Sequence, residues 1–135
     1  MHVQLIRADI TSMKVDAMVN PSASEEDPVA AGNLLCRFII PAVVPEIGSE
    51  DSEMRLRNST QRALERAEGL AVASVALPAL WTAPPEAVDR CAEIMLDVTL
   101  DFASRARSLQ RVVYCLFNES VYEAFDRVLQ RSRQH

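Results

Sequence analysis

Apolar and polar side chains alternate along the first segment of the chain, residues 3–8, and this segment ends at Asp9. Alternation with a period of two is typical of a β-strand with one buried face. The mostly apolar segment 16–20 predicts a second, buried strand, which ends in Asn20. Between them, residues 11–14 are predicted as a turn or a single helical turn. The pattern thus places one hydrogen-bonding side chain at the end of each strand.

Three later segments are apolar enough to form strands inside a sheet. They are residues 36–44, 70–80 and 112–117, and Pro41 makes the end of the first one irregular because proline has no N–H to donate. Residues 21–28 are rich in turn-forming side chains and predict a loop. The short run 29–32 that follows is interpreted as a remnant of a helix.

Three segments repeat apolar side chains at intervals of three and four residues, the period of a helix with one buried face. The first is predicted to begin with Ser49 as its cap and to end at Gly69. The second follows Pro84 and Pro85, which suit a first helical turn, and runs to about residue 104. The third is predicted to begin with Asn118 as its cap. The apolar stripes are Leu56, Thr60, Ala63 and Ala67; Val88, Cys91, Met95, Val98 and Phe102; and Val121, Phe125, Val128 and Leu129.

The order of these elements is three strands, then a helix, a strand, a helix, a strand and a helix. Such alternation predicts an α/β fold in which helices cover both faces of a largely parallel sheet. The 135 residues contain no internal repeat, linker or low-complexity tract. We therefore predict one compact domain over residues 1–135.

Composition and charge exclude several classes of function. The net charge is -5 at pH 7, which argues against a general binder of nucleic acid or of anionic membranes. The longest apolar run, residues 38–45, is too short to span a bilayer. Arg7 and Asp9 fall where a signal peptide would need its apolar region. The 3 cysteines are scattered through apolar stretches, which predicts reduced core thiols in a cytoplasmic protein.

No catalytic or metal-binding constellation stands out in the sequence. His2 and His135 lie at opposite ends of the chain without a paired spacing of cysteine or aspartate, so no metal site is predicted. Neither a Gly-x-Ser-x-Gly elbow nor a phosphate-binding Walker loop is present. The carboxylates have no identifiable partner for acid–base chemistry. No catalytic residue and no cofactor are therefore assigned from the sequence.

Several segments, in the right order, resemble the macro domains, a family that recognises ADP-ribose. The opening residues 3–11 and 15–20 are similar to the family's Gly-Asp-Ile-Thr and Asp-Ala-Ile-Val-Asn motifs. Residues 37–44, 58–67, 70–79 and 84–87 resemble later strands and helices of the family, and residues 112–129 resemble its last strand and helix. The resemblance implies a three-layer α/β/α fold with a mostly parallel, mixed central sheet.

The resemblance also implies a set of ligand-binding residues. Asp9 corresponds to the aspartate that contacts adenine, and Ile10 to the neighbouring backbone contact; the alternative for Asp9 is a cap on the turn that follows. A carboxylate suits the first role because it accepts a hydrogen bond from the exocyclic amine of adenine. Phe117 lies where the family often has an aromatic side chain near the adenine, with core packing as the alternative. Asn20 matches the first asparagine of the family's pair, whereas Ala23 replaces the second, which orients the distal ribose.

Both phosphate-binding loops of the family are reduced in this chain. An acidic segment, residues 25–32, stands where a glycine-rich run is expected, and the chain has 3 glycines where average usage would give roughly nine. Glycine-rich loops bind phosphates because consecutive N–H groups can point inward without clashes of Cβ atoms. At the second loop, the Thr82 hydroxyl and the N-terminus of the following helix remain as donors. Trp81 either stacks on a base or fills the space of the shortened loops.

Three hypotheses for the function follow. The first is a divergent, weakened binder of ADP-ribose or a related adenine nucleotide that has no hydrolase activity. The second is a macro fold that has lost nucleotide binding and acts through protein contacts, for instance as a homodimer. The third is an ADP-ribosyl hydrolase or an ADP-ribose-1″-phosphate phosphatase, which Ala23 and the missing glycine-rich loop disfavour.

Overall fold

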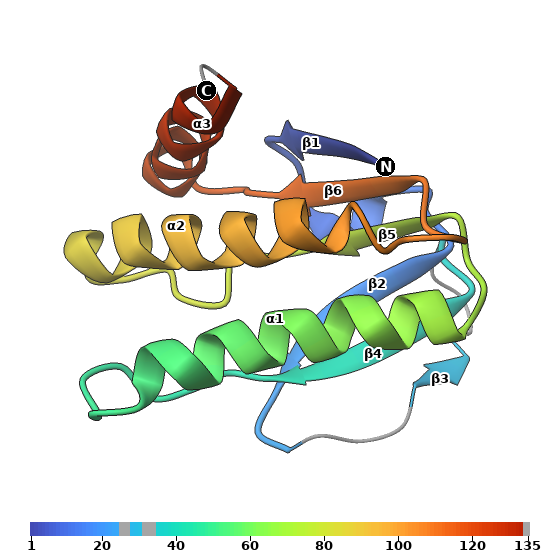
Figure 1. The fold of residues 1–135 in the computed structure, drawn as a ribbon, viewed down its shortest axis with the longest axis horizontal. Helices are drawn as coiled ribbons and strands as arrows, with labels where there is room; N and C mark the ends of the chain where they lie inside the picture. Colours follow the sequence, from blue (N-terminus) through green and yellow to red (C-terminus); the bar gives the residue numbers. More distant parts are fainter. Residues whose placement is uncertain (25–27, 31–34, 134–135) are drawn as a thin grey trace.

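The computed structural model describes residues 1–24, 28–30 and 35–133 of the 135-residue chain. Figure 1 shows a twisted sheet with helices packed across it. The strands are β1 (His2–Ile6), β2 (Ala17–Ser22), β3 (Val29–Ala30), β4 (Phe38–Val43), β5 (Ser74–Leu77) and β6 (Arg111–Cys115). The helices are the 3-10 helix η1 (Ile10–Ser12) and the α-helices α1 (Ser52–Gly69), α2 (Pro85–Phe102) and α3 (Glu119–Arg133).

Within the described residues, the sheet has six strands in the order β1-β6-β5-β2-β4-β3. All neighbouring strands run parallel except β3, which is antiparallel to β4. The predicted α/β class with a mostly parallel, mixed sheet is therefore confirmed. The prediction of a helical remnant is wrong for Val29–Ala30, which forms β3, while residues 31–32 lie outside the described residues. This segment forms a strand because the outer edge of β4 carries backbone N–H and C=O groups without a partner in β2. Even two extended residues can bond to these groups.

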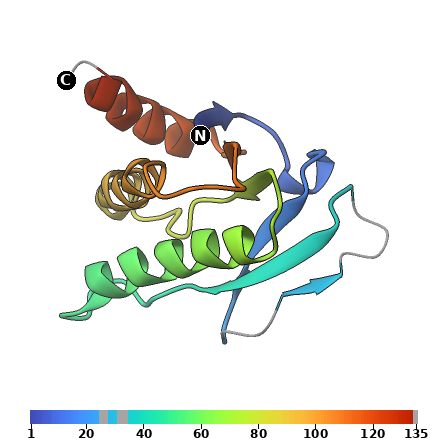
Figure 2. The same cartoon turned by 45° about the vertical axis from the view of Figure 1, so that its right-hand side comes forward.

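One face of the sheet carries the larger hydrophobic core. Ile40, Val75 and Tyr114 point to this face from three different strands and are buried. The stripes of α1, α2 and α3 all pack against it, and Figure 2 shows the three helices on the same side of the sheet. The Tyr114 hydroxyl lies 2.7 Å from Thr99 Oγ1 on α2, and its ring centroid lies 5.4 Å from that of Phe125 on α3. One buried tyrosine thus connects β6 with two helices.

The opposite face of the sheet has a thinner cover. Met18, Ala76 and Val113 point to it from β2, β5 and β6 and belong to a smaller cluster. In the part of the chain that the structure describes, no α-helix covers this cluster; η1 lies behind the sheet in Figure 1, and Ile10 and Met13 pack against the cluster. The prediction that helices cover both faces therefore holds only in part: the described α-helices all lie on one face, and the other face carries the 3-10 turn η1.

The helix starts agree with the sequence in one case and differ in another. Asn118 caps α3 as predicted, because its Oδ1 accepts a hydrogen bond from the Ser120 N–H at 2.9 Å. The prediction of Ser49 as the cap of α1 is wrong, since α1 begins at Ser52 with Asp51 in the cap position. The Ser49 hydroxyl donates to the Asp51 carboxylate at 3.2 Å instead.

Two carboxylates fasten the amino edge of the sheet, which is the edge where β2, β5 and β6 begin. Glu68 near the end of α1 accepts hydrogen bonds from the backbone N–H groups of residues 107–109, just before β6. Burial raises the pKa of Glu68, but donation from these three groups outweighs it and holds the pKa below its usual value. Asp16 Oδ2 accepts from the N–H groups of Ala73 at 2.9 Å and Ser74 at 3.1 Å. Both carboxylates join segments that are distant in sequence.

Candidate functional site

A cleft of about 350 Å³ lies at the carboxyl edge of the sheet, which is the edge where β1, β6 and β5 end. Parallel strands end at a common edge, so residues that follow three separate strands meet there. The lining consists of Ala8, Asp9 and Ile10 after β1, Pro78, Ala79 and Thr82 after β5, and residues 115–118 and Val121 at the end of β6 and the start of α3. Four of the predicted binding residues, Asp9, Ile10, Thr82 and Phe117, thus line one cleft.

Asp9 is both the cap of η1 and a lining residue of the cleft. Its Oδ1 accepts hydrogen bonds from the Thr11 N–H at 2.9 Å and from the Thr11 hydroxyl at 2.7 Å. These bonds hold the pKa of Asp9 below its usual value, so the carboxylate is ionised at neutral pH. Asp9 Oδ2 has no hydrogen bond within the described residues. The cap therefore fixes the side chain and leaves one oxygen free to accept.

The backbone N–H of Ile10, next to this acceptor, is a donor without a partner in the described residues. Ile10 is the first residue of η1, and its N–H has no intrahelical partner and no other acceptor among the residues that the structure describes. An acceptor and a donor side by side match the edge of adenine, which presents an amine donor beside a ring-nitrogen acceptor. The turn at Asp9 and Ile10 can thus read a base edge with two hydrogen bonds.

Phe117 lies at the cleft and not in the core. Phe117 is the second residue after β6, and its side chain is 77% exposed, the largest exposure among the large hydrophobic residues that the structure describes. The alternative of core packing is therefore wrong. An exposed aromatic ring at the mouth of a cleft offers a surface for stacking with a planar ligand.

The other end of the cleft has few donors for a phosphate. The Thr82 side chain is exposed and lines the cleft. The helix behind it, α2, starts with Pro84 and Pro85, neither of which has an N–H. The Ala87 N–H is already bonded to the Pro84 carbonyl at 3.0 Å. The donors that a helix N-terminus usually offers to an anion are thus mostly absent.

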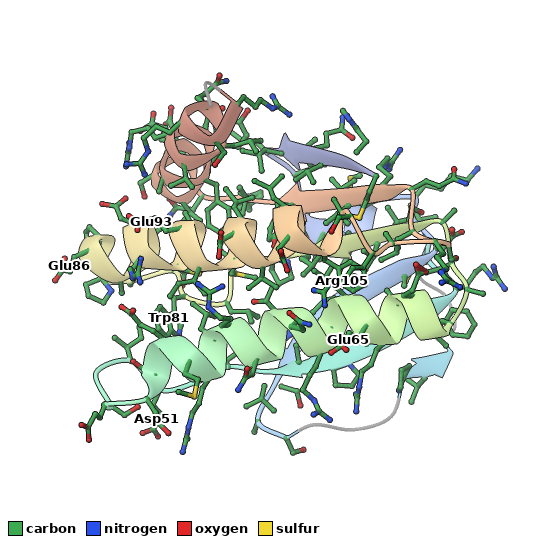
Figure 3. The ribbon with its side chains drawn as sticks, in the orientation of Figure 1. Asp51, Glu65, Trp81, Glu86, Glu93 and Arg105 are labelled. Carbon is green, nitrogen blue, oxygen red and sulfur yellow. The ribbon has the colours of Figure 1, made fainter. Side chains whose placement is uncertain are left out.

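Trp81 lies in the main core and does not line the cleft. Its side chain is 4% exposed, and its indole N–H donates to the Pro45 carbonyl oxygen at 2.9 Å. Figure 3 places Trp81 beside the start of α1 and below α2. This position favours the interpretation in which Trp81 fills space under the shortened loop over the one in which it stacks on a base.

Asn20 does not line the cleft. It lies near the end of β2, opposite Pro41 of β4, and its side chain is exposed. Strand β2 lies next to β5 on the side away from β6, so Asn20 is one strand beyond the cleft. Ala23, in the place of the second asparagine, is also exposed. The acidic residues 25–27 lie outside the described residues.

Two polar lining residues were not predicted as site residues. Cys115 ends β6 at the cleft, and burial raises the pKa of its thiol to about 11, so it stays protonated at neutral pH and is a poor nucleophile. Asn118 follows Phe117 and lines the cleft as well. Its Oδ1 is used for capping α3, which leaves its amide N–H groups to face a ligand. The sequence did contain a signal for Asn118, namely a helix-capping asparagine directly after a predicted strand.

The lining contains no pair of groups suited to acid–base catalysis. Asp9 is the one ionisable side chain besides Cys115 among the described lining residues, and its carboxylate is fixed by Thr11. A search of the described ranges finds no group of three or more His, Cys, Asp or Glu side chains that could hold a metal ion. Likewise, none of the helices in these ranges is long and apolar enough to cross a bilayer.

The chain matches a known family model. The family model described as the Macro domain matches residues 25–94, more than half of the chain. An uncharacterised protein of Pyrobaculum aerophilum is 29% identical over 170 residues, covering 96% of this chain and 91% of that protein. Because 96% of 135 residues is about 130, about 40 of the 170 aligned positions have no counterpart in this chain. An uncharacterised protein of Sulfolobus acidocaldarius is 33% identical over 106 residues, which cover 76% of this chain and 55% of that protein.

Solved macrodomains share the fold of this chain. The macro domain of ganglioside induced differentiation associated protein 2 superposes with a TM-score of 0.84 at 18% identity, covering 95% of this chain and 82% of that chain. The Oceanobacillus iheyensis macrodomain with ADP gives 0.84 at 18% identity and covers 96% and 90%. The Trypanosoma brucei macrodomain in complex with ADP gives 0.81 at 17% identity and covers 95% and 69%.

Proposed function

The chain belongs to the macro domain family, and we propose that its cleft binds the adenine end of ADP-ribose or a related adenine nucleotide without hydrolysing it. The observation that carries this proposal is the unused acceptor at Asp9 Oδ2 beside the unused donor at the Ile10 N–H. The exposed Phe117 ring adds a stacking surface. Two structures with the same fold, from Oceanobacillus iheyensis and Trypanosoma brucei, contain ADP, which supports an adenine nucleotide as the ligand class.

The binding we propose is weaker than a complete phosphate site would give. Thr82 is the polar lining residue nearest to the start of α2, and Pro84 and Pro85 supply no N–H. A hydrogen bond to a charged group contributes about 1.5–3 kcal/mol, so losing two or three such donors lowers the affinity for a pyrophosphate by orders of magnitude. Most of the affinity then comes from the base.

The absence of hydrolysis is part of the proposal, and two observations support it. By the resemblance to macro domains, Ala23 stands at the position of the asparagine that orients the distal ribose, and alanine cannot bond a ribose hydroxyl. Among the described lining residues, the ionisable group besides Asp9 is Cys115, whose raised pKa of about 11 leaves it protonated and unsuited to activating water. We further propose a reducing, cytoplasmic setting, because Cys36, Cys91 and Cys115 are all buried free thiols.

Calorimetric titration with adenosine, inosine and ADP-ribose tests this function, with Asp9→Asn as the diagnostic variant. Asparagine can still accept both Thr11 hydrogen bonds through Oδ1, but it turns the free acceptor toward the base into a donor. We expect the wild-type protein to prefer adenosine to inosine, which carries a carbonyl in place of the amine. Asp9→Asn should weaken adenosine binding about tenfold and remove that preference.

Thr11→Val is the matched control. It removes the hydroxyl that supports Asp9 Oδ1 but leaves the backbone donor and the carboxylate in place. Adenosine affinity should change less than about twofold, because the loss is confined to the capping side of the carboxylate. Absence of binding of both adenosine and ADP-ribose at millimolar concentration, in a folded sample, would contradict the proposed function.

A further inference from the structure

Two neighbouring strands end in the same capping arrangement at the cleft. Asp9 is the third residue after β1 and Asn118 is the third residue after β6, and these strands pair in parallel. Asp9 Oδ1 accepts hydrogen bonds from the Thr11 N–H at 2.9 Å and the Thr11 hydroxyl at 2.7 Å. Asn118 Oδ1 accepts from the Ser120 N–H at 2.9 Å and the Ser120 hydroxyl at 2.6 Å. Asp9 and Asn118 are therefore equivalent caps at neighbouring strand ends, and both line the cleft.

The hydrogen bonds at the start of α3 determine which atom of the Asn118 amide is the oxygen. The N–H groups of Ser120 at 2.9 Å and Val121 at 3.4 Å point to the same side-chain atom. A backbone N–H can only donate, so the atom that both contact must be the acceptor oxygen. The amide nitrogen then occupies the other position. The start of α3 thus orients this side chain before any ligand arrives.

The two caps differ in the group that they leave unused. Asp9 leaves a carboxylate oxygen, Oδ2, which is an acceptor. Asn118 leaves Nδ2 with two N–H groups, which donate to no acceptor within the described residues. Asn118 also carries the one side-chain amide among the described lining residues of the cleft. The cleft therefore has an oriented acceptor after β1 and an oriented donor after β6.

The place of Asn118 in the cleft indicates which part of the ligand it meets. Asp9 and Ile10 offer an acceptor and a donor to the edge of the base, and Phe117 offers a ring to its face. Asn118 directly follows Phe117, at the end of the strand between β1 and β5. The group attached to the base is the ribose 5′-phosphate, and each of its oxygens can accept a hydrogen bond. An amide donor suits this part of the ligand.

We propose that Asn118 is a ligand-binding residue whose amide donates to an oxygen of the ribose 5′-phosphate. The inference rests on the proposed function and adds a recognition group beyond the base. It gives the cleft a donor in place of those missing at the start of α2, where Pro84 and Pro85 have no N–H. Aspartate caps a helix as well as asparagine does, but it would bring a second negative charge beside Asp9. The neutral amide caps α3 without repelling a phosphate.

Asn118→Ser and Asn118→Asp separate binding from capping, because serine and aspartate both cap helices well. Calorimetric titration with adenosine and AMP measures the affinity, and thermal unfolding checks that the fold is kept. Asn118→Ser removes the amide donor and should weaken AMP binding about fivefold, and Asn118→Asp, which adds a charge, should weaken it about tenfold or more. A parallel loss for adenosine would identify a ribose oxygen as the acceptor, whereas unchanged adenosine binding would identify the phosphate.

Two results of these titrations would overturn the inference and leave the proposed function intact. One is unchanged AMP affinity in both variants, and the other is a loss in Asn118→Asp alone, which would show repulsion by the new charge without donation by the amide. Absence of binding of adenosine, AMP and ADP-ribose to the wild-type protein would overturn both. Ser120→Ala is the matched control, since it removes one hydroxyl bond to Oδ1 but keeps the N–H bond and the amide. Its AMP affinity should stay within about twofold of wild type.

The amide itself can be observed by nuclear magnetic resonance. The side-chain ¹H–¹⁵N signals of Asn118, assigned by their absence in Asn118→Ser, should shift when AMP is added to the wild-type protein. Asn58 is the internal control, because its exposed side chain lies on α1 and does not line the cleft. Its signals should stay in place. Unmoved Asn118 signals at saturating AMP would overturn the inference.

Discussion

The two edges of the parallel sheet use their polar groups in opposite ways. At the amino edge, Glu68 and Asp16 each accept several backbone N–H groups from segments that start other strands. At the carboxyl edge, Asp9 Oδ2 and the Ile10 N–H have no partner in the described chain, and Phe117 is exposed. At the first edge, both oxygens of Glu68 and Oδ2 of Asp16 hold strands of the fold together, whereas the second edge keeps an acceptor and a donor side by side for a ligand.

This difference separates stability from binding. A carboxylate with both oxygens bonded within the protein, as in Glu68, stabilises the fold and has no acceptor left for a ligand. A carboxylate with one bonded and one free oxygen is held in place and still available, as Asp9 is. We therefore expect variants at the amino edge to change the free energy of unfolding and variants at the carboxyl edge to change affinity.

The largest effect should come from Trp81→Ala. Trp81 lies beside the carboxyl edge, yet it is buried and should affect the free energy of unfolding, so it is an exception to the division between the two edges. Removing this buried ring and its hydrogen bond to Pro45 should lower the free energy of unfolding by about 3–5 kcal/mol. Urea denaturation followed by circular dichroism measures this. Trp81→Phe keeps most of the ring and loses the N–H, so it should cost clearly less. A loss below about 1 kcal/mol for Trp81→Ala would show that the ring does not support the fold.

At the amino edge, Glu68→Gln should lower the free energy of unfolding by about 1–2 kcal/mol at pH 7, because a neutral amide accepts three backbone N–H groups poorly. The pKa of Glu68 is lowered in the fold from its ordinary value of 4.5, so its stabilisation is fully present above that value. The stabilisation is lost as the pH falls through the lower, folded pKa.

The pH dependence distinguishes this cause from a general loss of packing. Urea midpoints between pH 7 and pH 3 should fall less steeply for Glu68→Gln than for the wild-type protein, and the two proteins should converge at the acidic end. Glu65→Gln, on the exposed face of the same helix (Figure 3), is the control and should follow the wild-type curve. Parallel curves for wild type and Glu68→Gln would refute the role assigned to this carboxylate.

Phe117→Ala should have the complementary effect. The ring is 77% exposed, so its loss should leave the unfolding midpoint nearly unchanged. Stacking of a base on an aromatic side chain contributes about 1–3 kcal/mol, so adenosine affinity should fall by about fivefold or more. Phe117→Tyr retains the ring face and should bind like the wild-type protein. A destabilised protein with unchanged affinity would contradict the assignment of this edge to binding.

The smallest effect should come from Thr82→Val. This variant keeps the shape of the side chain and removes the hydroxyl that lines the cleft. Adenosine affinity should change by less than about twofold, because the base is held at the opposite end of the cleft. Titration with adenosine measures it, and a tenfold loss would mean that the ligand depends on the loop before α2 more than on the turn at Asp9.

Local patterns in the sequence predicted the elements that form the carboxyl edge. The alternation before Asp9, the apolar run before Phe117 and the capping asparagine after it gave the ends of β1 and β6 and the start of α3. The assignment of Asp9, Ile10 and Phe117 to a common site came from the resemblance to macro domains, and the three residues line one cleft because parallel strands end together. The α/β class followed from the same alternation of elements.

Features that depend on distant partners were not predicted. Glu68 accepts hydrogen bonds from residues 39 to 41 positions away, and Asp16 from residues 57 and 58 positions away. No local sequence pattern therefore predicts that these carboxylates connect distant segments. The sequence left two interpretations of Trp81 open because its hydrogen-bond partner, Pro45, lies 36 positions earlier in the chain. The position of Asn20 outside the cleft follows from the order of strands, which the sequence alone did not fix.

The burial of Trp81 also gives the protein a built-in optical probe. It is the only tryptophan in the chain, so the indole fluorescence of the protein has a single source. That source is enclosed in the core and is followed directly by Thr82, a lining residue of the cleft. Its emission should be that of an indole shielded from water, and it should shift to longer wavelength when the loop before α2 opens or the core unfolds. One signal can therefore follow both events without any label.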